Sequence, residues 1–252
     1  MTDRRRGLIH PIRPACGCKF ILVEKVFSLS FLVAIEGIDG SGKGTQAARL
    51  NEQLQQAGTA TTLLSFPRYE HTFFGKAIGE FLNGRFGTLD EVDPFLASLL
   101  YAGDRFESRN VLAEALDQSD VVVLDRYVPS NIAHQGAKLD GERRDELIAR
   151  IRHIEFELYG LPHPDLVLLL DLPADEAGRL IAKKQARSYT DKKADLQEAD
   201  GGYLARVRDV YRQLAAEDSG WVTIDCLSDG QLRSIEEIGE DVTRAVQDRR
   251  TK

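Results

Sequence analysis

Length, composition and charge limit the class of protein first. The chain has 252 residues, of which 42% are hydrophobic, which is enough for one α/β domain with a full core or two at most. Its net charge of −7 argues against a protein that coats nucleic acid or an anionic membrane. No apolar run in the sequence reaches the ~18 residues that a transmembrane helix needs.

The composition of the N-terminal segment is not typical of a folded domain. Basic and proline-rich residues precede Cys16 and Cys18, which could bind metal but have no second pair of ligands. We expect residues 1–30 to be a non-globular extension, with the working protein beginning near Val26 to Phe31. With Cys226 the chain has three cysteines, an odd and low number that favours a reducing compartment, and we expect the cytoplasm.

Predicted strands and helices alternate along the rest of the chain. The predicted strands are Phe31–Glu36, Thr59–Phe66, Val121–Leu124, Leu166–Leu170 and Trp221–Ile224. The predicted helices are Gly42–Ala57, Asp93–Leu116, Arg143–Tyr159 and Tyr203–Glu217. Strands that are apolar on both faces belong in a buried parallel sheet covered by helices. We therefore predict an α/β fold with a doubly wound five-stranded parallel sheet, in a single domain over residues 31–250.

A glycine-rich stretch, Gly-Ile-Asp-Gly-Ser-Gly-Lys-Gly-Thr, runs from Gly37 to Thr45. Glycines let backbone N–H groups point at an anion, the following helix adds its positive end, and Lys43 adds a full charge. The spacing alone is common by chance, but the strand before it and the helix after it favour a phosphate loop over an ordinary turn. Gly44 stands where Ser or Thr usually ligates Mg²⁺, and the hydroxyl comes one residue later, which resembles nucleoside monophosphate kinases.

Charged side chains follow the next two strands. The second strand ends in Phe-Pro-Arg-Tyr (residues 66–69), where Arg68 suits a second phosphate group, with an incidental surface arginine as the alternative. The third strand ends in Asp125 and Arg126. Asp125 could hold hydrated Mg²⁺ and Arg126 could clamp a phosphate, or the two could form a structural ion pair. Ligands of such sheets gather at the C-terminal ends of the strands, where all these residues lie.

Two further features lie in helical patterns. Tyr101 and Arg105 are four residues apart and share a helix face, which suits a flat, polar-edged base. The alternative is a core tyrosine and an arginine that pairs with an acid. A basic run from Arg179 to Lys193 is either a solvated helix face or a lid, over about residues 179–195, that closes on the phosphates.

In this order, these segments resemble the thymidylate kinases, which phosphorylate dTMP with ATP, from about Phe31 to about Ile224. The matching motifs are the phosphate loop with Asp39, residues 66–69, Asp104-Arg105, Asp125-Arg126-Tyr127, Ser130-Asn131 and Gln135-Gly136. The resemblance implies a phosphate-loop kinase fold and transfer of the γ-phosphoryl group of ATP to dTMP, giving dTDP and ADP and supplying dTTP for DNA synthesis. It also implies a homodimer, and Mg²⁺ bound with ATP is the expected cofactor. From the acidic composition we expect neither nucleic acid nor membrane as a partner.

The resemblance implies roles for the acceptor-site residues. Asp39 would meet the sugar 3′-hydroxyl, Tyr101 would stack on thymine, and Arg105 would bond its carbonyl edge. His134 stands where other members often carry Tyr or Phe to exclude a ribose 2′-hydroxyl, so discrimination against ribonucleotides is less certain here. The full expected set is Asp39, Phe66, Pro67, Arg68, Tyr69, Tyr101, Arg105, Arg126, Asn131, His134 and Gln135.

The donor site follows from the phosphate loop and the basic run. The expected ATP-binding residues are Gly37, Ile38, Asp39, Gly40, Ser41, Gly42, Lys43, Gly44, Thr45, Arg179 and Lys184. Thr45 and Asp125 are the expected Mg²⁺ ligands. Some family members place a catalytic arginine where this chain has Gly40, so we expect the lid to supply that charge, Arg187 first. The expected catalytic residues are Lys43, Asp125, Arg126 and Arg187.

Two other functions compete with this interpretation. One is a neighbouring enzyme, an adenylate kinase or a deoxynucleoside kinase, although adenylate kinases usually have proline where Asp39 stands. The other is a nucleotide-binding regulatory protein that has lost catalysis, for which Gly44 and His134 are the only support.

Overall fold

One parallel sheet organises the chain. The computed structural model describes residues 30–183 and 201–251. The strands are β1 (Phe31–Glu36), β2 (Thr61–Ser65), β3 (Val121–Asp125), β4 (Leu166–Asp171) and β5 (Trp221–Asp225). They form a five-stranded sheet in the order β2-β3-β1-β4-β5, with every pair parallel. The predicted doubly wound five-stranded parallel sheet is confirmed.

The strands differ in burial according to their place in the sheet. The central β1 pairs with β3 and β4, so that Val33 lies opposite both Val123 and Leu166. All residues of β4, and all but one of β3, are buried. The edge strand β2 is mostly half-buried, and the edge strand β5 is mostly half-buried or exposed. β2 is shorter at both ends than the predicted Thr59–Phe66. Threonines in β2 therefore face a partly wet edge, as is usual for edge positions.

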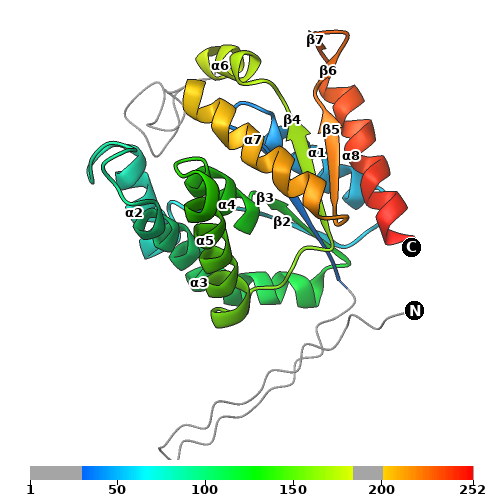
Figure 1. Cartoon of the computed structure of the whole chain (residues 1–252). Coiled ribbons are helices and arrows are strands. Elements are labelled where there is room, and N and C mark those ends of the chain that lie inside the picture. The colour runs from blue at the N-terminus through cyan, green and yellow to red at the C-terminus, as the bar shows by residue number, and fades with distance from the viewer. Residues whose placement is uncertain (1–29, 184–200, 252) are drawn as a thin grey trace, which may run out of the picture.

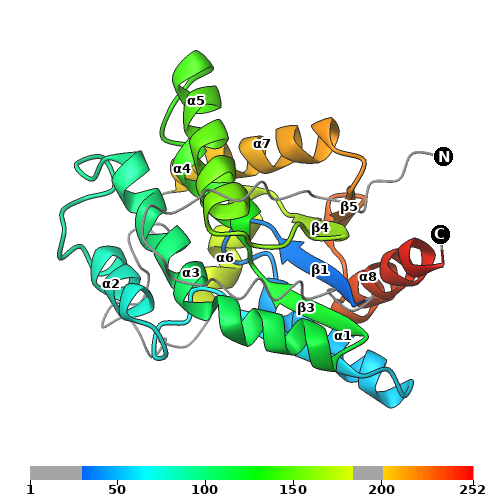
Figure 2. The same cartoon turned by 90° about the horizontal axis from the view of Figure 1, so that it is seen from below.

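Helices cover both faces of the sheet (Figure 1 and Figure 2). The α-helices are α1 (Lys43–Gln56), α2 (Phe73–Leu82), α3 (Pro94–Gln118), α4 (Val128–Gly136), α5 (Gly141–Arg152), α6 (Ala174–Lys183), α7 (Gly201–Glu217) and α8 (Ile235–Arg250). α1 and α8 pack on one face, and α4 and α7 lie across the other, while α2 and α3 lie side by side at one flank. A small antiparallel pair, β6 (Leu227–Ser228) and β7 (Gln231–Leu232), precedes α8.

The predicted single helix Arg143–Tyr159 is wrong in one respect. The α-helix α5 ends at Arg152, and a π-helix, η1 (His153–Leu158), continues it. Tyr159 N–H donates to the Ile154 carbonyl at 2.9 Å, the wide spacing of a π turn. π turns are rare, and many of them lie at functional sites. The helical periodicity of the sequence did not predict this one.

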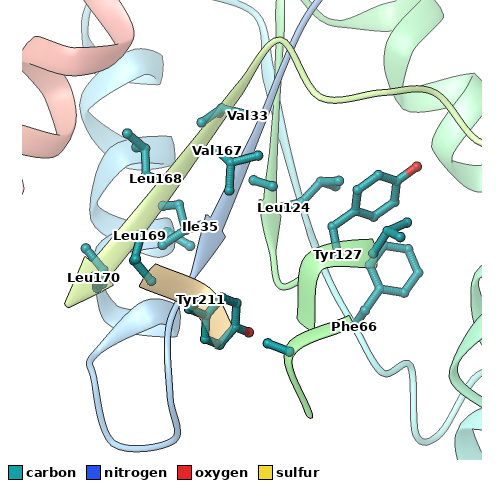
Figure 3. Close-up of a cluster of buried hydrophobic side chains, with 14 of the residues drawn as sticks. Val33, Ile35, Phe66, Leu124, Tyr127, Val167, Leu168, Leu169, Leu170 and Tyr211 are labelled. Atoms are coloured by element: carbon teal, nitrogen blue, oxygen red, sulfur yellow. The ribbon is translucent and has the colours of Figure 1, made fainter. Parts of the chain in front are cut away.

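The core lies between the sheet and the helices (Figure 3). Apolar side chains of β1, β3 and β4 form its centre, and two tyrosines, Tyr127 and Tyr211, are fully buried beside it. The Phe66 and Tyr127 rings lie 6.2 Å apart between centroids, which fixes the start of the loop after β2 against the chain after β3. In the part of the chain that the structure describes, no helix is long and apolar enough to cross a membrane.

Candidate active site

The glycine-rich loop connects the end of β1 to the first turn of α1, as predicted. Together with Asp125 and Arg126 it lines a cavity of about 210 Å³. The ammonium group of Lys43 is buried and donates to the Ile38 carbonyl at 2.7 Å. Burial, reinforced by the nearby charge of Arg126, lowers the pKa of Lys43 to about 7. An anionic phosphate in this cavity would oppose that shift, because it favours the charged ammonium.

Gly44 stands at the close approach of the loop to Asp125. A Cβ atom at Gly44 would lie 3.0 Å from the Asp125 Oδ2. The other carboxylate oxygen, Oδ1, is buried and has no hydrogen-bond partner among the described residues. An unpaired buried carboxylate oxygen beside a phosphate loop fits Mg²⁺, which proteins hold through one or two carboxylates, waters and substrate phosphates. Asp125, together with the hydroxyl of Thr45 in the first turn of α1, would hold that ion.

Glu36, the last residue of β1, was not predicted as a site residue, but it connects β1 to the chain after β3. Glu36 is fully buried and accepts hydrogen bonds from the Tyr127 backbone N–H (2.7 Å), the Ser130 hydroxyl (2.6 Å) and the Tyr211 hydroxyl (2.9 Å). Burial raises the pKa of Glu36 despite these hydrogen bonds. The sequence does carry a signal for this role, because Glu36 is an acid at the end of an apolar strand. A carboxylate buried there needs several hydrogen-bond donors.

Arg126 forms its ion pair with Asp39 and not with the neighbouring Asp125. Nη2 of Arg126 donates to the Asp39 Oδ1, so the pair bridges the phosphate loop and the chain after β3. Arg126 has a φ of 67°, the left-handed region that side chains rarely adopt, and its Nη1 lies 3.4 Å from the Ser130 hydroxyl. Burial disfavours its charge, but Asp39 and the other negative groups nearby together outweigh burial and raise the pKa of Arg126. Its predicted contact with a phosphate remains a prediction.

The loop after β2 is held by a buried carboxylate. Asp104 on α3 accepts from the Arg68 backbone N–H at 3.0 Å and from the Thr72 hydroxyl at 2.5 Å. Burial raises the pKa of Asp104. The Phe66–Pro67 peptide is cis, and the half-exposed Arg68 side chain reaches the Ser108 hydroxyl at 3.4 Å. Arg68 and the half-buried Pro67 and Tyr69 are thus fixed at the C-terminal edge of the sheet, where they were predicted to lie.

A cluster of buried polar side chains lies on α4, which packs against α3. Asn131, His134 and Gln135 on α4 are all buried. Four of their polar atoms have no partner within the described ranges: Asn131 Oδ1, His134 Nε2, and both amide atoms of Gln135. Unpaired buried polar atoms are rare in native proteins, and a cluster of them indicates a place where a ligand or water supplies the missing partners. Tyr101 on α3 is half-buried beside Ile78 and Phe81.

Arg105, on the same helix as Tyr101, pairs with an acid. Its Nε and Nη2 atoms both donate to Glu155 of η1, and both side chains are buried. This is the alternative that the sequence analysis left open for Arg105. Its contact with the edge of a base remains a prediction, since Nη1 is not used by Glu155.

His134 has one ring nitrogen fixed by a tyrosine. The Tyr203 hydroxyl donates to the His134 carbonyl at 2.8 Å and lies 3.1 Å from Nδ1. Because the hydroxyl hydrogen is used in the first contact, Nδ1 must carry the proton in the second, and Nε2 is then an acceptor. Burial lowers the pKa of His134 to about 3, so its ring is neutral at physiological pH.

The predicted lid lies mostly outside the described residues. Arg179 on α6 is exposed and pairs with Glu176 at 2.5 Å. Lys184 and Arg187 lie outside the described ranges, as do Cys16 and Cys18. The ATP contacts predicted for Arg179 and Lys184 stay predictions.

A phosphate loop after the central strand of a parallel sheet, with a buried polar cluster on the helix after the neighbouring strand, is the arrangement of a P-loop nucleotide kinase. A family model described as thymidylate kinase matches residues 35–238. The chain belongs to the thymidylate kinase family.

Known proteins of this family resemble the chain over most of its length. The thymidylate kinase of Mycobacterium tuberculosis is 35% identical over 190 residues, which is 75% of this chain and 87% of the relative. The human thymidylate kinase is 30% identical over 216 residues, covering 84% and 87% of the two chains. The structure of the Candida albicans thymidylate kinase superposes with a TM-score of 0.67 at 26% identity, covering 88% of this chain and 92% of that one.

Proposed function

We propose that this protein transfers the γ-phosphoryl group of ATP to dTMP, giving dTDP and ADP. Membership of the thymidylate kinase family and the combination of two neighbouring sites support this reaction. The observation that carries it is the Asp39–Arg126 pair, since it joins the phosphate loop to the chain between β3 and α4, the helix that carries the polar cluster. One residue pair thus belongs to both sites, as direct transfer between two nucleotides requires.

In the proposed reaction the acceptor phosphate attacks the γ-phosphorus of ATP while the bond to the β-phosphate oxygen breaks. The acceptor oxygen is already anionic, so no general base is needed. Lys43 and the loop N–H groups hold the donor phosphates, and Arg68 and Arg126 hold the acceptor phosphate. Mg²⁺, when bound by Asp125 and Thr45, would neutralise phosphate charge. The nearby carboxylate of Asp39 keeps Arg126 charged and oriented until the substrate arrives.

Arg187 is the residue that we propose to stabilise the transferring phosphoryl group. The phosphate loop carries Gly40 and not an arginine, so that Lys43 is its only basic side chain. Arg187→Ala should lower the turnover number by about 10³-fold with little change in nucleotide affinity, as for arginine fingers. An unchanged turnover number would move the role to Arg179 or Lys184.

A homodimer and a cytoplasmic location complete the proposal. Exposed apolar side chains on the flank of α2 and α3, namely Phe73, Leu96, Phe106 and Val111, support association through these helices. Light scattering on the purified chain measures this directly, and a monomeric mass at micromolar concentration would exclude it. The low number of cysteines supports a reducing compartment. Cys226, for example, is buried as a free thiol.

A coupled assay of ADP release tests the reaction. The purified chain with ATP and Mg²⁺ is offered dTMP, dUMP, AMP or CMP in turn. We expect the highest kcat/KM with dTMP. A preference for AMP would favour an adenylate kinase, and activity with none of them would favour a binding protein.

A further inference from the structure

A buried carboxylate on the π-helix connects α3 to α4, the helix that carries the polar cluster. Glu155 is fully buried, although it belongs to a helix whose other acid, Glu157, is exposed. A carboxylate is retained in such a place only when it is paired and hydrogen-bonded. The partners of Glu155 come from α3 and α4, which pack beside α5 and η1 (Figure 1 and Figure 2).

One oxygen of Glu155 holds side chains from both helices. Its Oε1 accepts from the Arg105 Nη2 at 2.7 Å and from the Asn131 Nδ2 at 2.9 Å. Its Oε2 accepts from the Arg105 Nε. Arg105 and Asn131 are therefore tied to a common atom, and their relative position depends on it.

The contacts fix which way the Asn131 amide faces. Nδ2 donates to Glu155 and, at 3.0 Å, to the Ser98 carbonyl, so both amide hydrogens are used. A rotated amide would place Oδ1 against two oxygens and is excluded. The remaining atom, Oδ1, is buried without a partner among the described residues. Asn131 thus offers a ligand an acceptor and no donor.

The same carboxylate decides what Arg105 presents. A guanidinium has five N–H groups, and Glu155 uses Nε and Nη2. Neither contact uses Nη1, so Glu155 leaves the Nη1 hydrogens as donors. Burial disfavours the charge of Arg105, but Glu155, together with the nearby Asp104, outweighs burial and raises the pKa of the guanidinium.

We infer that Glu155 is a specificity-determining positioning residue, which sets a donor at Arg105 and an acceptor at Asn131 for the edge of the acceptor base. This inference rests on the proposed function. A pyrimidine with a carbonyl at C4 and a hydrogen at N3 complements that pair. Cytosine carries an amino group at C4 and no hydrogen at N3. Its amino donor would face the Arg105 donor, and its N3 acceptor would face the Asn131 acceptor.

Glu155→Gln tests this inference, because the carboxylate accepts all three of its hydrogen bonds and donates none. In either orientation the new amide NH2 faces a donor of Arg105 or Asn131, so the pair loses its fixed polarity. Glu157→Gln on the same π-helix is the matched control, since that side chain is exposed and pairs with His153. The purified full chain is assayed with ATP and dTMP, dUMP or dCMP, and folding is followed by thermal melting.

The expected result separates base recognition from general damage. Glu155→Gln should raise the KM for dTMP and lower the dTMP-over-dCMP ratio of kcat/KM, each by about tenfold or more. The dTMP-over-dUMP ratio and the KM for ATP should stay within about twofold, and Glu157→Gln should match the wild type. An unchanged dTMP-over-dCMP ratio, or equal rises in both KM values, overturns the inference.

Two controls keep the outcome decisive. If Glu155→Gln does not fold, Glu155→Asp takes its place, since it keeps the charge but is too short for all three contacts. The same fall in the dTMP-over-dCMP ratio is expected, and its absence again overturns the inference. If the wild type phosphorylates no pyrimidine nucleotide, the proposed function fails together with the inference. If the wild type prefers dTMP and the variants keep that preference, only the inference fails.

Discussion

The guanidinium of Arg126 and the carboxylate of Asp39 form an ion pair that connects the phosphate loop to the chain after the third strand. Lys43 is close enough to this pair for both charges to act on its pKa, Arg126 lowering it and Asp39 raising it. Asp39 therefore balances two neighbouring cations in the absence of substrate.

Replacing Asp39 by asparagine should remove the negative charge that offsets these two cations. The variant leaves Arg126 and Lys43 to repel each other, so the free energy of unfolding should fall by about 1–2 kcal/mol. Saturating dTMP should recover more stability in the variant than in the wild type, because its phosphate supplies the missing negative charge. Urea unfolding with and without dTMP measures both effects. Equal stability of the two free proteins would contradict the role given to Asp39.

Binding of ATP should take up a proton through Lys43. With its pKa lowered to about 7, Lys43 is mostly neutral at pH 8, and a bound polyphosphate favours the charged form. Calorimetry at pH 8 in buffers of different ionisation enthalpy should show uptake of close to one proton, and ATP affinity should fall as pH rises above about 7. Lys43→Arg is always charged and should show no such uptake. The same uptake in that variant would assign the proton to another group.

His134 should make the protein less stable in mild acid. Its pKa of about 3 in the folded state lies below the ordinary 6.5, so the unfolded chain binds more protons between these values. Stability from this group is present above pH 6.5 and is lost as pH falls toward 3, with a slope of up to about 1.4 kcal/mol per pH unit. His134→Phe should show a shallower loss in urea unfolding between pH 7 and 4.5. Identical slopes would mean that the histidine is not buried in its neutral form.

Gly40 should resist any side chain for a reason beyond its backbone angle. Its φ is +86°, and an added Cβ would lie 2.6 Å from the Ala177 carbonyl oxygen on α6. Gly58 has a similar φ of +78° with open space around it, so Gly58→Ala measures backbone strain alone, about 1 kcal/mol. Gly40→Ala should cost at least about 2 kcal/mol and also lower the turnover number. Equal losses for the two variants would show that α6 does not press on the loop.

The sequence allowed the sheet and the phosphate loop to be predicted because both depend on local patterns. Apolar strands, a glycine run and a following helix occur within short stretches of chain. Arg68, Asp125 and Arg126 could be placed at one edge because parallel strands end together. Short helices such as α2 and α4 were not predicted, since tertiary packing stabilises them more than their own sequence does.

The partners of the site residues were not predictable in the same way. Asp39 with Arg126 and Arg105 with Glu155 are pairs separated by long stretches of sequence, and their contacts exist only once the helices pack. Glu155 stands between Ile154 and Phe156, and nothing in the sequence distinguishes it from the exposed Glu157. The π-helix that carries it also had no visible pattern.

Transfer of a labelled phosphoryl group tests the central claim most directly. The purified chain is incubated with Mg²⁺, dTMP and ATP labelled at the γ-phosphate, and the nucleotides are separated. The account predicts that the label appears in dTDP, in equal amount to the ADP formed. Label found in inorganic phosphate, or in no product at all, would contradict it.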